Sequence, residues 1–165
     1  LMIIGPVAVA LILLLLYVTF RSIRLALLVL SNLPFALIGG IFSLFLSGQY
    51  LSVPASVGFI VLFGVAVLNG LVLVSRIAQL RDEGLSIDEA VRQGAVDRLR
   101  PVLMTASIAI FSLMPMLFAG GTGSEIQKPL ATVVVGGLIT STLLTLLIIP
   151  AVYGWFEKKQ PEPET

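Results

Sequence analysis

The stretch "VDRLRPVLMTASIAIFSLMPM", residues 96–116, changes from charged to wholly apolar at a proline. Arg98 and Arg100 stand just before Pro101, and no charged residue occurs from there to Ala119. Because a helix rises 1.5 Å per residue, these 19 residues span about 28 Å, close to the roughly 30 Å hydrocarbon core of a bilayer. Proline is also favoured as a first helical residue, since it has no N–H to leave unpaired. The stretch therefore predicts a membrane-spanning helix that begins at Pro101.

The composition of the whole chain agrees with a membrane location. Hydrophobic residues make up 58% of the 165 residues and charged residues only 12%. Soluble domains have roughly 45–50% apolar and about 25% charged residues. We therefore expect most of the chain to lie in a lipid bilayer.

The remaining spans follow from the positions of charges and helix breakers. From Leu25 to Ser75 the chain carries no charge over 51 residues, a length of about 76 Å if it formed one helix. It must therefore turn, and "SGQYLSVP", residues 47–54, supplies the breakers. The sequence predicts an all-α membrane protein: a bundle of five transmembrane helices with a short amphipathic cytoplasmic connector helix. The predicted segments are a transmembrane domain at 1–156, with spans at about 1–20, 25–47, 54–80, 101–119 and 129–156, and a disordered tail at 157–165.

The lysines and arginines predict the orientation of this bundle. Nine of the ten fall on one side of the proposed membrane, and only Lys128 falls on the other. Cytoplasmic loops retain positive charge, so the crowded side is predicted to be cytoplasmic. The N-terminus is then periplasmic and the C-terminus cytoplasmic.

The connector at 86–98 has the pattern of a surface helix. Ser86 stands three residues before Glu89, the spacing of a capping box. Apolar residues recur every four positions from Ile87 through Val91. We expect an amphipathic helix that lies on the membrane surface.

Missing residue types exclude several kinds of chemistry. The chain has no His and no Cys, so it cannot build an imidazole–thiolate metal site or a disulfide. No Asp or Glu lies within a predicted span, which removes the carboxylates of an intramembrane protease or a proton relay. The basic residues are explained by topology and show no nucleic-acid-binding pattern. We predict neither an enzyme nor a metal or cofactor site, and any proton-carrying acid must come from elsewhere.

The few polar residues in or near the spans each allow two interpretations. Asn69 either joins two helices by a hydrogen bond or lines a watery path. The hydroxyl of Thr105, two helical turns after Arg98, either serves a relay or bonds its own backbone. Arg98 and Arg100 are either anchors at the cytoplasmic interface or functional cations.

Glycines inside the spans predict close helix contacts, because they let another backbone approach. The third span, which carries Asn69 between two of them, is predicted to be the most central. The predicted packing glycines are Gly64, Gly70, Gly136 and Gly137.

Two long blocks carry a family resemblance. They are "FGVAVLNGLVLVSRIAQLRDEGLSIDEAVRQGAVDRLRPVLMTA" at 63–106 and "PMLFAGGTGSEIQKPLATVVVGGLITSTLLTLLIIPAVYGWF" at 115–156. Both resemble the last membrane helices of the resistance-nodulation-division (RND) efflux permeases, and the second is more similar to the heavy-metal-efflux branch than to the multidrug branch. The resemblance covers nearly the whole chain.

This resemblance implies a proton-driven transporter of the bacterial inner membrane with twelve helices, of which this chain supplies helices eight to twelve. It implies a homotrimer with a periplasmic adaptor and an outer-membrane channel as partners. The N-terminal half, absent here, would carry the relay acids on helix four.

The resemblance also assigns residues. Arg98 and Thr105 match positions of the proton-coupling network, and Asn69 matches the family asparagine of the third span. Multidrug members carry a lysine where this chain has Leu68, so the network must differ here. On this basis we prefer the functional interpretation for Arg98 and the anchor interpretation for Arg100.

The substrate and two other function classes stay open at this point. The resemblance implies methionines in the last helix of copper- and silver-exporting members. This chain has Val134 and Leu138 in that region, which favours divalent cations as the substrate. The chain could instead be a translocation module for drugs, lipid or polypeptide. It could also be a membrane scaffold that only binds partner helices.

Overall fold

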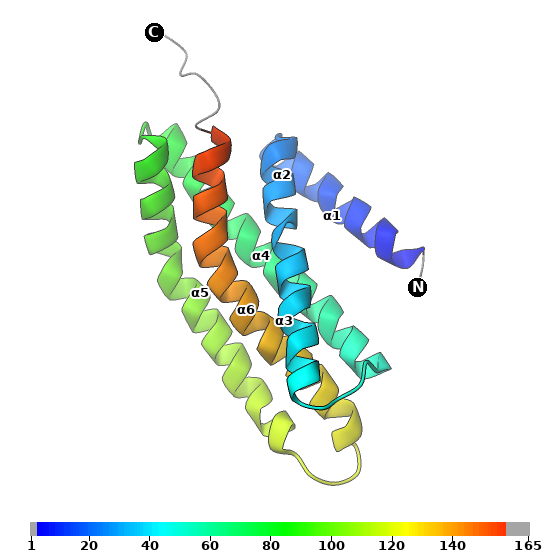
Figure 1. The fold of residues 1–165 in the computed structure, drawn as a ribbon. Helices are drawn as coiled ribbons and strands as arrows, with labels where there is room; N and C mark the ends of the chain where they lie inside the picture. Colours follow the sequence, from blue (N-terminus) through cyan, green and yellow to red (C-terminus); the bar gives the residue numbers. More distant parts are fainter. Residues whose placement is uncertain (1–2, 158–165) are drawn as a thin grey trace.

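The computed structural model describes residues 3–157, and this part of the chain forms a bundle of helices without strands (Figure 1). The helices are α1 (Ile4–Phe20), α2 (Ile23–Leu30), α3 (Asn32–Leu46), α4 (Val53–Asp82), α5 (Ile87–Phe118) and α6 (Ser124–Glu157). The predicted all-α transmembrane bundle is confirmed. Of the predicted tail at 157–165, Glu157 is the last residue of α6, and residues 158–165 lie outside the described part of the chain.

Four segments are long and apolar enough to cross a bilayer: α2 with α3, then α4, α5, and α6 up to Tyr153. α1 is apolar but shorter, with 17 residues, and it packs mainly against α2 at the side of the bundle (Figure 1). The turns after α1 and α4 and the end of α6 lie at one end of the bundle, which we call the basic end (Figure 1). The α3–α4 and α5–α6 turns lie at the opposite end.

α5 corrects the prediction that the connector and the fourth span are separate. One helix runs without a break from Ile87 to Phe118, so Pro101 lies inside it and is not its first residue. The helix begins earlier because the predicted capping box forms: Ser86 Oγ accepts from the Glu89 amide at 3.4 Å, and the Glu89 carboxylate accepts from the Ser86 amide at 3.4 Å. Membrane helices tolerate an interior proline when neighbouring groups satisfy the freed backbone.

The first part of α5 packs against α4 and does not stand apart from the bundle. Gly94 is buried, and a Cβ added there would lie 2.6 Å from Ile77 Cγ1 of α4. Ala90, one turn earlier, is also buried and belongs to one apolar cluster with Ile77. The segment 86–98 therefore belongs to the same helix as the fourth predicted span and is held by packing on α4. The contact is made by Ala90 and Gly94, whereas Ile87 and Val91, which indicated a surface helix, are half-buried.

The second predicted span is interrupted near Ser31, between α2 and α3. Pro34 has no N–H to donate to the carbonyl of Leu30, so the helical hydrogen-bond ladder loses one bond at this point. Asn32, at the start of α3, is only 3% exposed. The interruption thus places an amide side chain inside the bundle.

α6 is at least as central as α4, which the sequence had placed at the centre. α6 packs against α2, α3, α4 and α5. Half of its most apolar 18-residue stretch is buried, compared with 44% of the same kind of stretch in α4. Figure 1 shows it between α5 and α3. In α5 only 11% of the most apolar 18-residue stretch is buried, so most of that stretch is not covered by other helices of this chain.

The predicted packing glycines behave differently from one another. A Cβ at Gly136 would collide with Ser43 of α3, and a Cβ at Gly137 would collide with Leu62 of α4. A Cβ at Gly70 would lie 3.1 Å from Val29 of α2. At Gly64 a Cβ would meet nothing within 4 Å in the described chain, so only the first three glycines bring helices together here.

Candidate proton-coupling site

Arg98 lies on the face of α5 that packs into the bundle. The buried residues Gly94, Val102 and Ala106 recur every four positions on this face, and Arg98 occupies the turn between the first two. Its side chain is half-buried, whereas Arg100, about 200° around the helix, is exposed. Within residues 3–157 Arg98 forms no ion pair. The structure thus separates the two arginines as the preferred interpretation expected, although their functional roles stay predictions.

Thr105 lies two turns after Arg98 on nearly the same face of α5, about 10 Å along the axis. Its side chain is exposed, and its hydroxyl donates to the Pro101 carbonyl at 2.9 Å. Because Pro101 forms part of the same helical turn, this bond is local to α5. The local interpretation therefore describes Thr105 within this chain, and a relay role stays a prediction.

Asn69 is 8% exposed and faces the interior of the bundle, whereas its neighbour Leu68 is 58% exposed. The structure buries its side chain within this chain, next to Gly70, which packs on α2. Leu68, where the resemblance implies a lysine in multidrug members, is the position that faces outward. Within the described chain no hydrogen bond joins Asn69 of α4 to Arg98 or Thr105 of α5.

Asn32 is a buried polar residue that the sequence analysis missed. Its Nδ2 donates to Thr145 Oγ1 at 2.6 Å and to the Ala66 carbonyl at 3.3 Å. One amide thus connects the start of α3 with α6 and α4. The available signal was an asparagine two residues before Pro34 in an otherwise apolar span.

The middle of α6 adds further buried hydroxyls. Thr145 is fully buried, and Ser141 and Thr142, one turn earlier, are also buried. Among the described residues, Ser141 Oγ and Thr142 Oγ1 have no hydrogen-bond partner. The motif "TSTLLT" at 140–145 was the sequence signal for this polar segment, since buried hydroxyls in an apolar span need partners.

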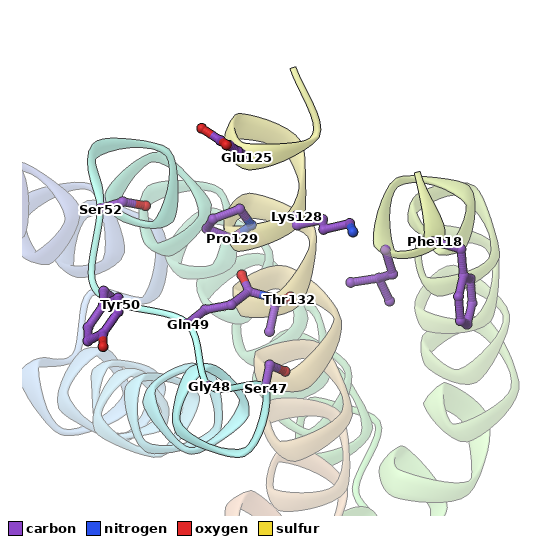
Figure 2. Close-up of a pocket in the computed structure, with 11 residues that line it drawn as sticks. Ser47, Gly48, Gln49, Tyr50, Ser52, Phe118, Glu125, Lys128, Pro129 and Thr132 are labelled. Carbon is purple, nitrogen blue, oxygen red and sulfur yellow. Dashed lines mark hydrogen bonds between the residues drawn. The ribbon is translucent and has the colours of Figure 1, made fainter. Parts of the chain in front are cut away.

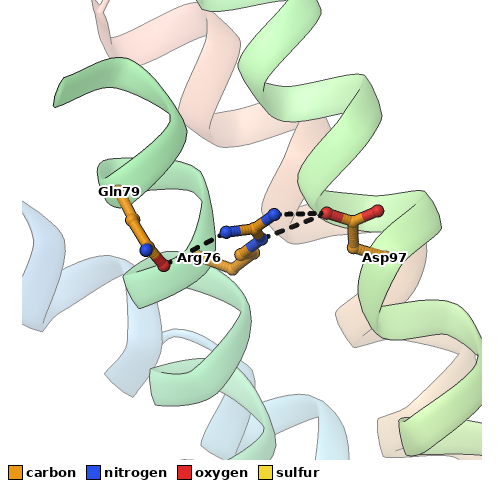
Figure 3. A network of polar contacts seen from close by, with 3 residues as sticks. All are labelled: Arg76, Gln79 and Asp97. Atoms are coloured by element: carbon orange, nitrogen blue, oxygen red, sulfur yellow. Dashed lines mark hydrogen bonds and ion pairs between the residues drawn. The ribbon is translucent and has the colours of Figure 1, made fainter. Parts of the chain in front are cut away.

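An ion pair joins α4 and α5 at the basic end (Figure 3). Arg76 Nε and Nη2 both donate to Asp97 Oδ2, at 3.1 and 2.9 Å, and Nη1 donates to Gln79 Oε1 at 3.2 Å. The side chains are 26% exposed for Arg76 and 35% for Asp97. The sequence analysis had counted Arg76 only as a topological charge, because no local pattern indicates a partner 21 residues away.

A groove of about 810 Å³ opens at the opposite end, between the α3–α4 turn and the start of α6 (Figure 2). Gln49 Nε2 donates to Thr132 Oγ1 at 3.1 Å, and Ser43 Oγ donates to the Thr132 carbonyl at 3.0 Å. Lys128 points toward α5 near Phe118, and Glu125 points away from it (Figure 2). Among residues 3–157 no three acidic side chains gather in a group that could hold a metal ion.

Comparison with known proteins identifies the class of membrane protein that this bundle represents. The profile of the AcrB/AcrD/AcrF family matches residues 1–157, so the chain belongs to this family. An X-ray structure of a heavy metal efflux pump superposes with a TM-score of 0.87 at 46% identity, over 95% of this chain and 16% of that one. The resemblance to RND efflux permeases is thus confirmed.

Several relatives that match nearly the whole chain are named for metal resistance or cation efflux. The cobalt-zinc-cadmium resistance protein CzcA of Cupriavidus metallidurans is 52% identical over 164 residues, which are 99% of this chain and 15% of the relative. The nickel and cobalt resistance protein CnrA of the same species is 51% identical over 158 residues, 96% of this chain and 15% of the relative. The cation efflux system protein CusA of Escherichia coli O157:H7 is 41% identical over 159 residues, 90% of this chain and 15% of the relative. The chain therefore spans about 15% of the length of these relatives.

Proposed function

We propose that this chain forms the C-terminal membrane part of a proton-driven efflux pump that exports heavy-metal cations. The observation that carries the proposal is Arg98, a half-buried cation without an ion pair among residues 3–157. No Asp or Glu occurs in the apolar segments 25–75, 101–119 and 129–156. A cation near a carboxylate favours its ionised form, so Arg98 can act on acids that another part of the pump supplies.

The open surface of α5 supports such a partner. Only 11% of its most apolar 18-residue stretch is buried within this chain, and the helix carries both Arg98 and Thr105. A helix of this hydropathy can be covered by lipid or by other helices of the pump. We infer that the N-terminal half, with its relay acids, packs near this helix, and that the complete pump is a homotrimer with a periplasmic adaptor and an outer-membrane channel.

The basic end of the bundle supports the proposed orientation. Arg24 of α2 lies toward this end, as do Arg76 and Arg81 of α4 and the arginines of α5. By the positive-inside rule this end faces the cytoplasm, and the α3–α4 and α5–α6 turns face the periplasm. The protein is then a multi-pass protein of the inner membrane, with its N-terminus periplasmic and its C-terminus cytoplasmic.

The substrate class is proposed from the relatives and from α6. Relatives that are 51–52% identical are named for resistance to cobalt, zinc, cadmium and nickel. Val134 and Leu138 of α6 are buried and apolar, and neither offers a sulfur ligand. Divalent cations are therefore favoured over copper or silver.

Transport in inverted vesicles tests the proposal. Vesicles that contain the full-length pump should accumulate zinc or cobalt when a proton gradient is imposed, and an uncoupler should abolish the accumulation. Vesicles with residues 1–165 alone should accumulate neither, because the chain lacks intramembrane acids. Gradient-driven movement of a drug or lipid without metal movement would favour the alternative translocation module, and metal uptake by residues 1–165 alone would contradict the proposal.

A further inference from the structure

The Arg76–Asp97 pair stands directly beside Arg98. Asp97 precedes Arg98 in α5, so their side chains leave the helix about 100° apart. Both guanidinium contacts of Arg76 reach the same oxygen, Asp97 Oδ2, at 2.9 and 3.1 Å (Figure 3). Asp97 is therefore the acid adjacent to the proposed coupling cation, and Arg76 compensates its charge from another helix.

The pair also lies where α4 and α5 approach closely. Gly94, three residues before Asp97, packs on Ile77, the residue after Arg76. Gln79, one turn along α4, accepts a third bond from the same guanidinium at 3.2 Å. This arrangement fixes the carboxylate and the guanidinium relative to each other.

Other charges near Arg98 are few in the described chain. On α5 the neighbouring charges are Arg92 and Arg100, both exposed, and Glu89, which lines one hollow together with Arg92 and Asp97. At the end of α4 they are Arg81 and Asp82, beyond Arg76. From Pro129 to Phe156 α6 carries no charged residue, and its titratable residues at this end are Tyr153 and the last residue of the helix, Glu157. Asp97 and Arg76 are thus the charges best placed to change the effect of Arg98.

We propose that Arg76 is a positioning residue for proton coupling: it holds and neutralises Asp97, so that the charge of Arg98 acts undiminished on the relay acids of the other half. The inference rests on the proposed function. An uncompensated Asp97 would oppose Arg98 and favour the protonated form of those acids. An uncompensated Arg76 would add to Arg98 and favour their ionised form.

Removal of one charge of the ion pair should therefore shift the pH dependence of export in the opposite direction to removal of the other. In the full-length pump, Arg76→Gln should move the pH of half-maximal zinc uptake into inverted vesicles upward by about half a unit. Asp97→Asn should move it downward by a similar amount. The double variant, which has no ion pair but the original net charge, should return close to wild type.

Matched variants separate this role from a merely structural one. Gln79→Ala removes a neutral contact of the same guanidinium, and Arg76→Lys keeps the charge, so neither should move the pH midpoint even if abundance falls. Uptake is normalised to inserted protein. Shifts in the same direction, no shifts, or a double variant that does not return would overturn the proposal.

The outcome is distinguishable from failure of the proposed function. Arg98→Ala is measured in the same vesicles, and normal proton-driven uptake in that variant would remove the coupling role of Arg98 itself. If Arg98→Ala abolishes uptake while the Arg76 and Asp97 variants leave the midpoint unchanged, only the positioning role is overturned.

Discussion

Asn32 and Thr145 lie 113 positions apart in the sequence, and a hydrogen bond of 2.6 Å joins them inside the bundle. The Asn32 amide also reaches the Ala66 carbonyl, so α3, α4 and α6 meet at one polar point. In an apolar environment such a bond fixes which faces of the helices meet, because its alternative is an unpaired polar group.

Removal of this bond should destabilise the bundle by a small but coupled amount. We expect Asn32→Ala and Thr145→Val each to lower the unfolding free energy of the purified protein in detergent micelles. A double-mutant cycle isolates their interaction, for which membrane hydrogen bonds give about 0.6 kcal/mol on average and about 1.7 at most. Additive losses would show that the bond contributes nothing to stability.

The packing glycines give a second prediction. Gly137→Ala should lower the amount of folded protein, because the added methyl would collide with the side chain of Leu62, which is fully buried. Overpacking of this kind costs about 1–3 kcal/mol. Gly64→Ala is the matched control and should leave folding unchanged, because that position is open in this chain. The measurement is the yield of monodisperse protein after detergent extraction, and equal yields for the two variants would contradict the packing role of Gly137.

The two polar residues of α4 and α3 show what the sequence could predict and what it could not. Hydropathy predicted the helical bundle and the spans, since apolar length alone decides whether a segment can cross a bilayer. It could not tell that Asn69 faces inward while Leu68 faces outward, because that difference depends on which neighbours cover α4. Asn32 was missed for the same reason: its partners come from α4 and α6, far along the chain.

α5 shows a local prediction that tertiary packing overrode. The capping box at Ser86 was predicted and forms, yet Pro101 was taken as a helix start and lies inside the helix. Proline fits a first turn, but it is also tolerated inside membrane helices when neighbours satisfy the backbone. Here Gly94 packs on Ile77 of α4 and supports the segment before the proline. The sequence offered no sign of that contact, nor of the Arg76–Asp97 pair beside it.

Asn69 supports a third prediction, which separates its two interpretations. In the full-length pump, Asn69→Leu should leave abundance nearly unchanged, since a membrane hydrogen bond averages only about 0.6 kcal/mol. Its burial inside this bundle favours a packing role, so we expect proton-driven zinc uptake per inserted pump to fall less than twofold. A loss of uptake at normal abundance would instead place Asn69 in the proton-coupling network.

The last prediction separates the two arginines of "RLRP". Arg98→Ala in the full-length pump should abolish or strongly reduce metal uptake at normal abundance, because the half-buried cation no longer favours the ionised form of the relay acids. Arg100→Ala should lower metal uptake only slightly, because that side chain is exposed. Even without Arg98 and Arg100, seven lysines and arginines on the predicted cytoplasmic side would still hold the topology. Uptake into inverted vesicles, normalised to inserted protein, measures both variants. Equal and small losses would leave both arginines as interface anchors. Arg98→Lys then asks what the site requires: lysine keeps the charge but loses the planar, multi-donor guanidinium, so substantial recovery would assign the effect to charge and none would assign it to geometry.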